Sequence, residues 1–235
     1  MYKGIYIALS GALLKQKHMD TFANNVANAN TTGFKKERVS FKDYMIPVDN
    51  KVSSVDDGRV MSEMSNIMTD FSHGGISQTG NPLDLAINGE GFFALEGNLY
   101  TRNGSFKVSS DGYLATNDDV KVLGDGGPIS IDGNKIEIGD SGDILVDGVS
   151  VGKLSIVNFE NKNVLLKQNG SVFTTDVQGV AGDSKVSQGY IEASNVEVVR
   201  EMVQMLNTVR EFESYQKMIK AFDEAASKTI NEMGK

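Results

Sequence analysis

One serine, Ser141, stands in a context that could suggest nucleophilic catalysis. It follows Asp140 between two glycines, in the segment 139–142. A catalytic serine needs a histidine to take its proton and a carboxylate to orient that histidine. The sequence has two histidines, His18 on the polar face of an expected helix and His73 in a glycine-flanked stretch, and neither has the surroundings of a catalytic base. We therefore predict that residues 139–142 form a β-turn.

Three aspartates near that serine could attract a hard cation such as Ca²⁺, which binds several oxygen ligands. Asp140, Asp143 and Asp147 do not have the spacing of a calcium-binding loop of about 12 residues, and aspartate beside glycine is expected in turns. The sequence also has no G-x-x-x-x-G-K-[ST] phosphate loop, no H-E-x-x-H pair and no G-x-S-x-G elbow. We predict a protein that is not an enzyme and has no catalytic residue, metal or cofactor.

Composition excludes several classes of protein. The net charge of −8 over 235 residues argues against nucleic acid as the main partner. The absence of cysteine excludes a disulfide framework. No stretch approaches the roughly 20 consecutive apolar residues of a membrane span. The first residues lead into an amphipathic helix, so we expect no cleaved secretory signal.

A long helix is predicted at the start of the chain, over 5–28. Apolar or small residues recur there at alternating spacings of four and three, with Gln16 as a polar interruption, which is the pattern of a heptad seam. The asparagines, threonines and glycine that follow, up to Phe34, favour the end of a helix, and Gly33 suits a turn with positive φ. The predicted seam is Ile5, Leu9, Ala12, Gln16, Met19, Ala23 and Val26.

A second long helix is predicted over 196–233, with Ser194 and Asn195 as N-cap and Glu197 near the capping-box position. Gln216, like Gln16, either fixes the register of a helix pair or lies where the seam meets water. Two matching seams indicate a helical hairpin or association with copies of the chain. The seam predicted here is Met202, Met205, Val209, Phe212, Gln216, Ile219, Ala226 and Ile230.

The middle of the chain has short β-type runs separated by glycine turns. A three-residue loop at 96–98, a two-residue hairpin at Asn103-Gly104 and turns such as Asp147-Gly148 are typical of antiparallel strands. The stretch before these runs has little periodicity and is interpreted as an extended connector. The fold class is therefore α+β, with long terminal helices forming a coiled-coil-like domain and an inserted β-rich domain. The predicted domains are 1–35 with 194–235, a connector over 36–80, and a β-rich domain over 81–193.

Several motifs in this order resemble the bacterial flagellar basal-body rod and hook family. An asparagine run ending in T-T-G-F-K is similar to the family's N-terminal signature, N-P-L-D-L-A-I followed by G-E-G-F-F to its central motif, and S-N-V-E-V-V to its C-terminal helix. The match is loose from about 124 to 188. The motif residues are Asn24, Asn25, Asn28, Thr32, Gly33, Phe34, Asn81, Pro82, Leu83, Asp84, Gly91, Phe92, Ser194, Asn195 and Arg210.

The resemblance implies a structural subunit that polymerises through its terminal helices into a hollow axial structure and transmits torque. The implied partners are copies of itself, other axial rod or hook proteins and the surrounding rings, with no nucleic acid and no small-molecule substrate. The implied location is the periplasmic part of the basal body, reached by type III export. A proximal rod subunit is favoured over a distal one by the short chain and its opening residues. The alternatives are a distal rod or hook-type subunit, or a soluble β-domain binding module whose helices form a private hairpin.

Overall fold

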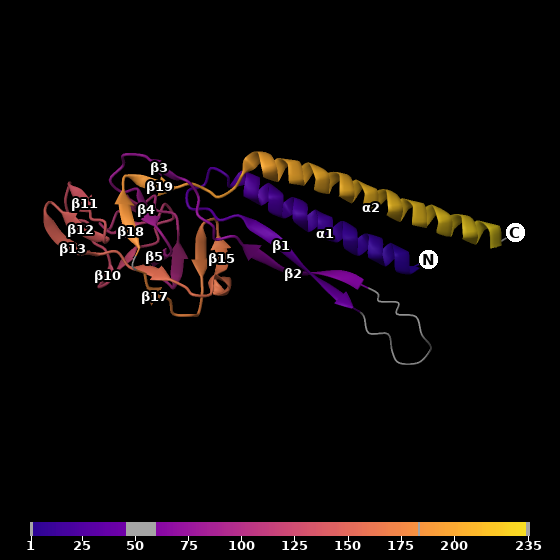
Figure 1. Ribbon diagram of the computed structural model, residues 1–235, viewed down its shortest axis with the longest axis horizontal. Coiled ribbons are helices and arrows are strands. Elements are labelled where there is room, and N and C mark those ends of the chain that lie inside the picture. Colours follow the sequence, from indigo (N-terminus) through magenta and orange to yellow (C-terminus); the bar gives the residue numbers. More distant parts are fainter. Residues whose placement is uncertain (1, 46–59, 183, 234–235) are drawn as a thin grey trace. The chain divides into compact units, whose positions relative to one another are not determined.

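The computed structural model describes residues 2–45, 60–182 and 184–233, with side chains at 4–40, 67–182 and 184–228. The chain divides into two compact units. The helical unit comprises Met1–Ala27, Glu37–Met68 and Glu197–Lys235, and the β-rich unit comprises Asn28–Lys36 and Thr69–Val196. The α+β class is confirmed, with one helix at each end of the chain and strands between them (Figure 1).

The helical unit is built on an antiparallel pair, α1 (Tyr2–Ala27) and α2 (Val198–Met233). The ring of Phe222 lies against Gly4, and the ring of Tyr215 lies against Gly11. The two glycines are seven positions apart on α1, and the two aromatic residues are seven positions apart on α2. Small residues of α1 therefore pack against large aromatic residues of α2 in one constant register. This arrangement lets the two backbones approach closely without a gap.

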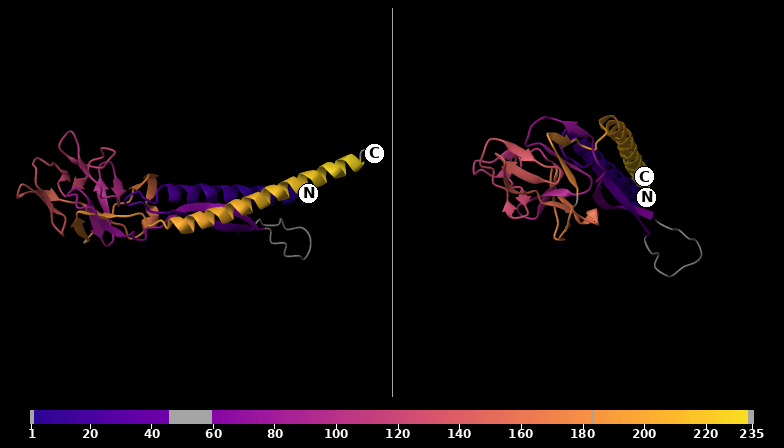
Figure 2. Two further views of the ribbon diagram at one scale, coloured as in Figure 1. Left: turned by 90° about the horizontal axis from the view of Figure 1, so that it is seen from above. Right: turned by 60° about the vertical axis from the view of Figure 1, so that its left-hand side comes forward.

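A β-hairpin completes the helical unit. Its strands β1 (Glu37–Met45) and β2 (Val60–Thr69) pair with each other, and the hairpin runs beside α1 in both Figure 1 and Figure 2. Asn25, near the end of α1, joins the hairpin to the helix. Its Nδ2 donates to the carbonyl of Glu37 at 2.9 Å, and its Oδ1 accepts the N–H of Glu37 at 2.9 Å. The side chain thus pairs with Glu37 as a neighbouring strand would.

The β-rich unit contains one six-stranded antiparallel sheet in the order β15-β16-β6-β5-β14-β17, together with smaller sheets. The strands of the large sheet are β5 (Phe92–Leu95), β6 (Leu99–Thr101), β14 (Ile156–Asn158), β15 (Leu166–Asn169), β16 (Val172–Thr174) and β17 (Val180–Ala181). A single 3₁₀ turn, Lys162–Val164, precedes β15 among the described residues. The smaller sheets pair β3 (Ile76–Gln78) with β19 (Tyr190–Glu192), β4 (Leu85–Asn88) with β18 (Lys185–Gln188), β7 (Lys107–Val108) with β8 (Leu114–Ala115), β9 (Leu123–Gly124) with β10 (Gly127–Pro128), and β11 (Ile136–Ile138) with β12 (Asp143–Val146) and β13 (Val149–Lys153).

Two hydrophobic clusters hold the β-rich unit together. The larger cluster surrounds the fully buried Phe93 and Leu114, and the smaller one is a group of aromatic rings around Phe92 and Phe173, whose centroids lie 5.8 Å apart. Truncating one buried phenylalanine of this kind costs about 3–5 kcal/mol. The unit therefore has its own core.

Three turn predictions at loops of the β-rich unit are confirmed. The chain turns between β5 and β6 over 96–98, and Leu95 pairs with Leu99. Asp147-Gly148 is a two-residue loop between β12 and β13, where Val146 pairs with Val149. At 139–142 the N–H of Gly142 bonds to the carbonyl of Gly139 at 2.9 Å, which closes a β-turn around Ser141.

The hairpin predicted at Asn103-Gly104 is wrong. Strand β7, which follows it, pairs with β8 and not with β6. Gly104 serves a different purpose: its carbonyl accepts the N–H of Leu85 at 2.9 Å, and a Cβ added to it would lie 1.7 Å from the carbonyl oxygen of Leu85. A glycine that permits close backbone approach has the same local sequence as one that permits a tight turn.

Two further expectations differ from the structure. The extended connector over 36–80 is not confirmed, since β1, β2 and β3 lie within it; residues 46–59 of that range lie outside the described residues. The N-cap at Ser194-Asn195 is wrong, because α2 begins at Val198. Asn195 instead uses its side chain to bind backbone groups of other segments.

Candidate assembly interface

A buried ion cluster lies where three segments of the β-rich unit, distant in sequence, meet around Lys35, Arg102 and Glu192. The Nζ of Lys35 lies 2.6 Å from Oε1 of Glu192, and the Nε of Arg102 lies 2.7 Å from Oε2 of the same carboxylate. All three side chains are at most 3 % exposed. The N–H of Gly74 also donates to Oε1 of Glu192, at 2.9 Å. Both carboxylate oxygens thus accept hydrogen bonds from charged or backbone donors, which such deep burial requires.

Arg102 extends this cluster to the backbone of neighbouring strands. Its Nη1 donates to the carbonyls of Gly89 and Gly91 at 2.9 and 2.7 Å, and its Nη2 lies 3.1 Å from Nδ1 of His73. The second histidine of the sequence therefore contacts a structural arginine. These bonds fix the ends of β4, β5 and β6 around one guanidinium group.

Gly33 and Phe34 bring the first motif segment to this cluster. Gly33 has φ of +66°, and its N–H donates to the backbone carbonyl of Glu192 at 2.7 Å. Phe34 is buried, and the Nζ of Lys167 lies 3.7 Å from the centre of its ring. The signature T-T-G-F-K thus places a positive-φ residue, an aromatic anchor and a buried cation in sequence.

Asn195 ties the segment before α2 to the same cluster. Its Oδ1 accepts the N–H of Lys36 at 2.8 Å, and its Nδ2 donates to the carbonyls of Asp70 and Ser72 at 2.8 and 3.1 Å. We call the bonded segments 31–36, 70–74, 101–104 and 192–195 the motif junction. Lys35 closes the T-T-G-F-K signature, but neither it nor Arg102 or Glu192 was predicted as a site residue, although each is a charged residue within or next to an apolar strand-like run.

The remaining motif residues lie at several places. Asn81 accepts the N–H of Leu83 at 3.2 Å with its side chain, and the carbonyl of Asp84 accepts the N–H of Gly189 at 2.8 Å, so 81–84 is a structured turn. Phe92 belongs to the aromatic cluster. Pro82 is exposed in that turn. The others lie near the end of α1, before α2 or on α2: Asn24, Asn28, Thr32 and Arg210 are exposed or half-buried, and the hydroxyl oxygen of Ser194 accepts the N–H of Val196.

Glu192 makes the stability of the β-rich unit depend on pH. Burial opposes its ionisation, but the charges of Arg102 and Lys35 prevail and hold the pKa of the carboxyl below its ordinary value. A lowered pKa in the folded state contributes stability that is fully present above the unfolded-state pKa of about 4.3 and is lost as pH falls through the folded-state pKa. We expect the free energy of unfolding to fall more steeply below about pH 4 in the unchanged protein than in a Glu192→Gln variant. Urea titrations at several pH values check this, and parallel pH curves for the two proteins would contradict it.

The helices of the helical unit face each other along one stripe each. On α1 this inward stripe contains small residues, Gly4, Ala8, Gly11 and Ala12. Lys15 follows them, and its Nζ forms an ion pair with Glu211 of α2 at 2.6 Å. Of the predicted seam residues on α1, Ala12 is buried. Ile5, Met19 and Val26 are half-buried, while Leu9, Gln16 and Ala23 are exposed.

On α2 the inward stripe steps by four and three through the residues that are least exposed: Glu201, Met205, Thr208, Phe212, Tyr215, Ile219, Phe222 and Ala226. Four predicted seam residues, Met205, Phe212, Ile219 and Ala226, lie on it, and Val209 is half-buried beside it. Met202 and Gln216 are exposed, one position away from inward residues. Ile230 belongs to α2, but its side chain lies outside the described residues.

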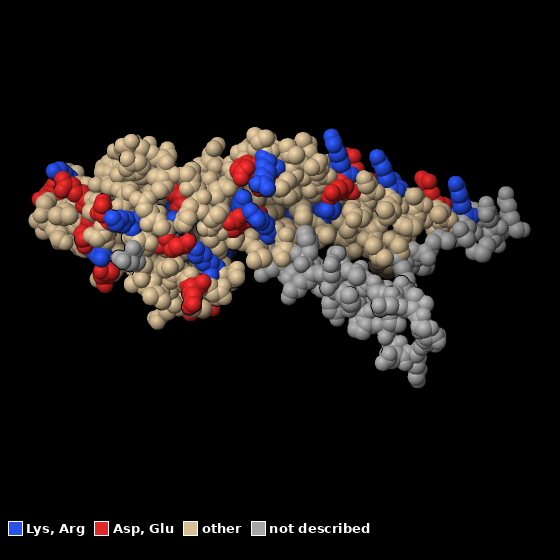
Figure 3. Space-filling view, in the orientation of Figure 1, with Lys and Arg blue, Asp and Glu red and all other residues tan. Residues whose placement is uncertain are grey.

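Both helices leave apolar side chains on their outward faces. On α1, Tyr6, Leu9 and Leu13 are 64, 44 and 58 % exposed, and we call them the α1 outer stripe. On α2, Val199, Val203 and Leu206 are 77, 53 and 57 % exposed, and we call them the α2 outer stripe. Figure 3 shows charged side chains spaced along the upper edge of the helix pair, with uncharged surface between them. Exposed apolar patches of this kind are typical of interaction surfaces.

Asn25 also links the two helices, because its Nδ2 lies 3.1 Å from Oε2 of the buried Glu201. An Asn25→Asp substitution removes the donor and places a second carboxylate beside the first. We expect a loss of about 2–3 kcal/mol in the stability of the helical unit, measured as a lower melting temperature of the helical circular dichroism signal. Asn207→Asp, the same change at an exposed position of α2, is the matched control. Equal melting temperatures for the two variants would contradict this role.

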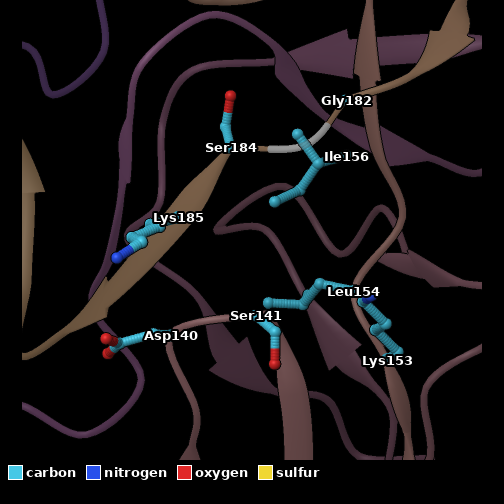
Figure 4. A pocket seen from close by; sticks show the side chains of 8 residues that line it. All are labelled: Asp140, Ser141, Lys153, Leu154, Ile156, Gly182, Ser184 and Lys185. Carbon is cyan, nitrogen blue, oxygen red and sulfur yellow. The ribbon is translucent and has the colours of Figure 1, made fainter.

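A hollow of about 340 Å³ lies in the β-rich unit beside the turn that holds Ser141. Leu154 and Ile156 extend toward the middle of it, whereas Lys153 and Lys185 extend toward opposite sides (Figure 4). The hydroxyl of Ser141 donates to the carboxylate of Asp143. The polar groups around the hollow do not converge on one point, so it does not have the arrangement of a catalytic centre. On the described residues, no group of three or more acidic or histidine side chains could hold a metal ion, and no described helix is long and apolar enough to cross a membrane.

Three family models match this sequence in consecutive parts. The model described as "Flagella basal body rod protein" matches residues 5–35, "Flagellar hook protein FlgE/F/G D1 domain" matches 86–146, and "Flagellar basal body rod FlgEFG protein C-terminal" matches 187–232. The first and third coincide with the two helices and the adjoining parts of the motif junction. The second starts in β4 and ends with β12.

Curated relatives match over almost their whole length. The flagellar basal-body rod protein FlgF of Caulobacter vibrioides is 32 % identical over 248 aligned residues, covering 100 % of this chain and 99 % of the relative. FlgF of Mesorhizobium japonicum is 31 % identical over 245 residues with the same coverage. The rod protein FlgG of Bacillus subtilis is 32 % identical over 265 residues, covering 98 % of this chain and 99 % of the relative.

Proposed function

The chain belongs to the flagellar basal-body rod protein family and is a structural subunit of the rod, and we propose that it assembles through its two terminal helices. The observation that supports this route is the pair of apolar outer stripes. Fully burying a large apolar side chain contributes roughly 1.5–3 kcal/mol relative to leaving it exposed, and these side chains, 44–77 % exposed, leave a large part of that contribution unused. Packing these helices against neighbouring subunits recovers that part.

The division of the chain into two units suits this role. The helical unit carries the outer stripes, while the β-rich unit has a separate core and a surface on which both signs of charge are mixed (Figure 3). We propose that the helical unit forms the inner wall of a hollow axial structure that transmits torque, and that the β-rich unit forms its outer layer. The partners are copies of this chain and other axial proteins, and no catalytic step is part of this function.

The position of the chain in the rod and its route there are part of the same proposal. We place the subunit in the proximal rod, within the periplasmic part of the basal body, and infer that it reaches this place by type III export. The division of the chain into one helical and one β-rich unit supports this position. A soluble binding module with a private helical hairpin is not favoured, because full-length relatives are rod proteins.

Deleting the gene in its own host and imaging isolated basal bodies tests the rod role. We expect cells that do not swim and rods that are missing or stop short, with both defects corrected by the unchanged gene. Rods that stop close to the inner membrane support the proximal position, and rods that stop farther out support a distal one. Complete rods in a strain without a second copy of the gene would rule out the proposal.

A further inference from the structure

The two outer stripes cannot cover each other within one chain. The contacts Gly4–Phe222, Gly11–Tyr215, Lys15–Glu211 and Asn25–Glu201 share one antiparallel register. In that register, residues 6–13 of α1 are level with residues 213–220 of α2. The α2 outer stripe at 199–206 is 14 residues away, which is about 21 Å along the helix axis.

The spacings within the stripes match when the helices run in opposite directions. Tyr6, Leu9 and Leu13 are separated by three and then four residues. Leu206, Val203 and Val199, read backwards, are also separated by three and then four residues. An antiparallel contact therefore places Tyr6 opposite Leu206, Leu9 opposite Val203 and Leu13 opposite Val199. In a parallel contact the middle partner of Val203 would be the polar Ser10.

The stripes also have the same length. On α1 the outward line becomes polar at Gln16 and Asp20, and on α2 it becomes charged at Arg210 and Glu213, all of them exposed. Each stripe thus provides about two helical turns of apolar surface, and polar or charged side chains follow it. Two surfaces of equal length and matching spacing on one chain favour a second copy of that chain as the partner.

From this match we infer that the α1 outer stripe of one copy packs on the α2 outer stripe of a neighbouring copy, displaced by 14 residues along the helix axis. This inference rests on the proposed assembly through the terminal helices and names the surfaces that meet. The displacement is two heptads, or about 21 Å. Because it is a whole number of heptads, the three–four spacing of the two helices stays aligned after the displacement. The contact joins two different surfaces, so a pair of copies keeps one free stripe of each kind, to which further copies can be added.

Cysteine cross-linking tests the register, since the chain has no cysteine of its own. The double variant Leu13→Cys/Val199→Cys is expressed in the deletion strain, and isolated basal bodies are oxidised and separated on a non-reducing gel. A disulfide requires Cβ atoms about 3.5–4.5 Å apart, which the inferred contact provides only between two copies. We expect adducts of two or more chains, and the same adduct when Leu13→Cys and Val199→Cys are supplied on separate chains.

The matched control is Leu13→Cys/Leu206→Cys, in which the second cysteine is moved by one heptad, about 10 Å. It should give no adduct. Either single variant alone should also give none, and an adduct of Leu13→Cys with itself would indicate a two-fold contact and overturn the inference. An adduct with a different basal-body protein would show that the neighbour is not a second copy. Rods that contain the double variant but yield no adduct would overturn the inference while leaving the rod role intact.

A charge exchange gives a second readout in the full-length protein. Leu9→Glu and Val203→Lys should each reduce swimming at least tenfold, because each places a charge against an apolar partner. Together they place opposite charges face to face, and we expect swimming to recover to within about threefold of the unchanged protein. The mismatched pair Leu9→Glu/Leu206→Lys should not recover. If cells with the cysteine pair do not swim, the unchanged chain is co-expressed to supply rods in which the adduct is read.

Discussion

Replacing Glu192 with glutamine is expected to destabilise the β-rich unit by about 3–5 kcal/mol, the usual cost of breaking a buried ion pair by removing one partner. The shape of the side chain is kept, but its charge is lost. Lys35 and Arg102 then remain as two buried cations, 2 and 3 % exposed, without a counter-charge. Burial already lowers the pKa of Lys35 and Glu192 opposes that shift, so the substitution further favours loss of the lysine proton.

Urea unfolding followed by circular dichroism in the β-sheet region measures this effect. Glu137→Gln is the matched control, because Glu137 pairs with Lys135 at 2.6 Å in the same unit but both side chains are more than half exposed. Exposed pairs of this kind often contribute nothing measurable, so the unfolding midpoint should not change. Equal midpoints for the two variants would show that the ion cluster is not buried in solution. In cells, the less stable Glu192→Gln protein should also support fewer complete rods.

Gly33→Ala is expected to cost about 3 kcal/mol or more, because two penalties add. The residue has φ of +66°, which side chains with a Cβ adopt at a cost of roughly 1–2 kcal/mol. A Cβ at this position would also lie 2.3 Å from the backbone nitrogen of Asn103. A backbone atom cannot rotate away, so the segment must move and its bond to Glu192 must lengthen.

Gly97→Ala separates the two penalties. Gly97 has φ of +85°, but no heavy atom lies within 4 Å of the position that its Cβ would take. This control should lose only the conformational cost of about 1–2 kcal/mol. Urea unfolding of both variants gives the difference, which is the cost of the contact with Asn103. If Gly33→Ala is no less stable than Gly97→Ala, the close approach in the motif junction is wrong.

The elements that local pattern determines could be predicted from the sequence. The seam spacing on α2 indicated a helix that the structure places at Val198–Met233, and Asp147-Gly148 indicated the loop between β12 and β13. Both signals act over a few neighbouring residues. They succeed because helix periodicity and turn conformation are local properties.

Interactions between distant segments could not be predicted in this way. Glu192 contacts Lys35, which is 157 residues away in sequence, and Arg102, which is 90 residues away. No local pattern around Lys35 indicates these two partners. Asn195 was predicted to cap a helix because an asparagine side chain often bonds to backbone groups a few residues away. Its actual backbone partners, Lys36, Asp70 and Ser72, lie in distant segments. On α2 the sequence allowed two neighbouring lines of residues to face α1, one through Gln216 and one through Tyr215. The contact of the Tyr215 ring with Gly11 shows that the line through Tyr215 faces α1.

The motif junction also has a consequence for how chains of this kind can change in length. The segments that enter and leave the β-rich unit are bonded to one another, with Gly33 joined to Glu192 and Asn195 joined to Lys36. The polypeptide between Ile76 and Tyr190 therefore starts and ends at one anchored place. Extra residues in its turns add only a loop-closure cost that grows slowly with length, and they leave the helices and their spacing unaltered. The alignment with FlgG of Bacillus subtilis extends over 265 positions, more than the 235 residues of this chain, which is the kind of length variation that such an anchor accommodates.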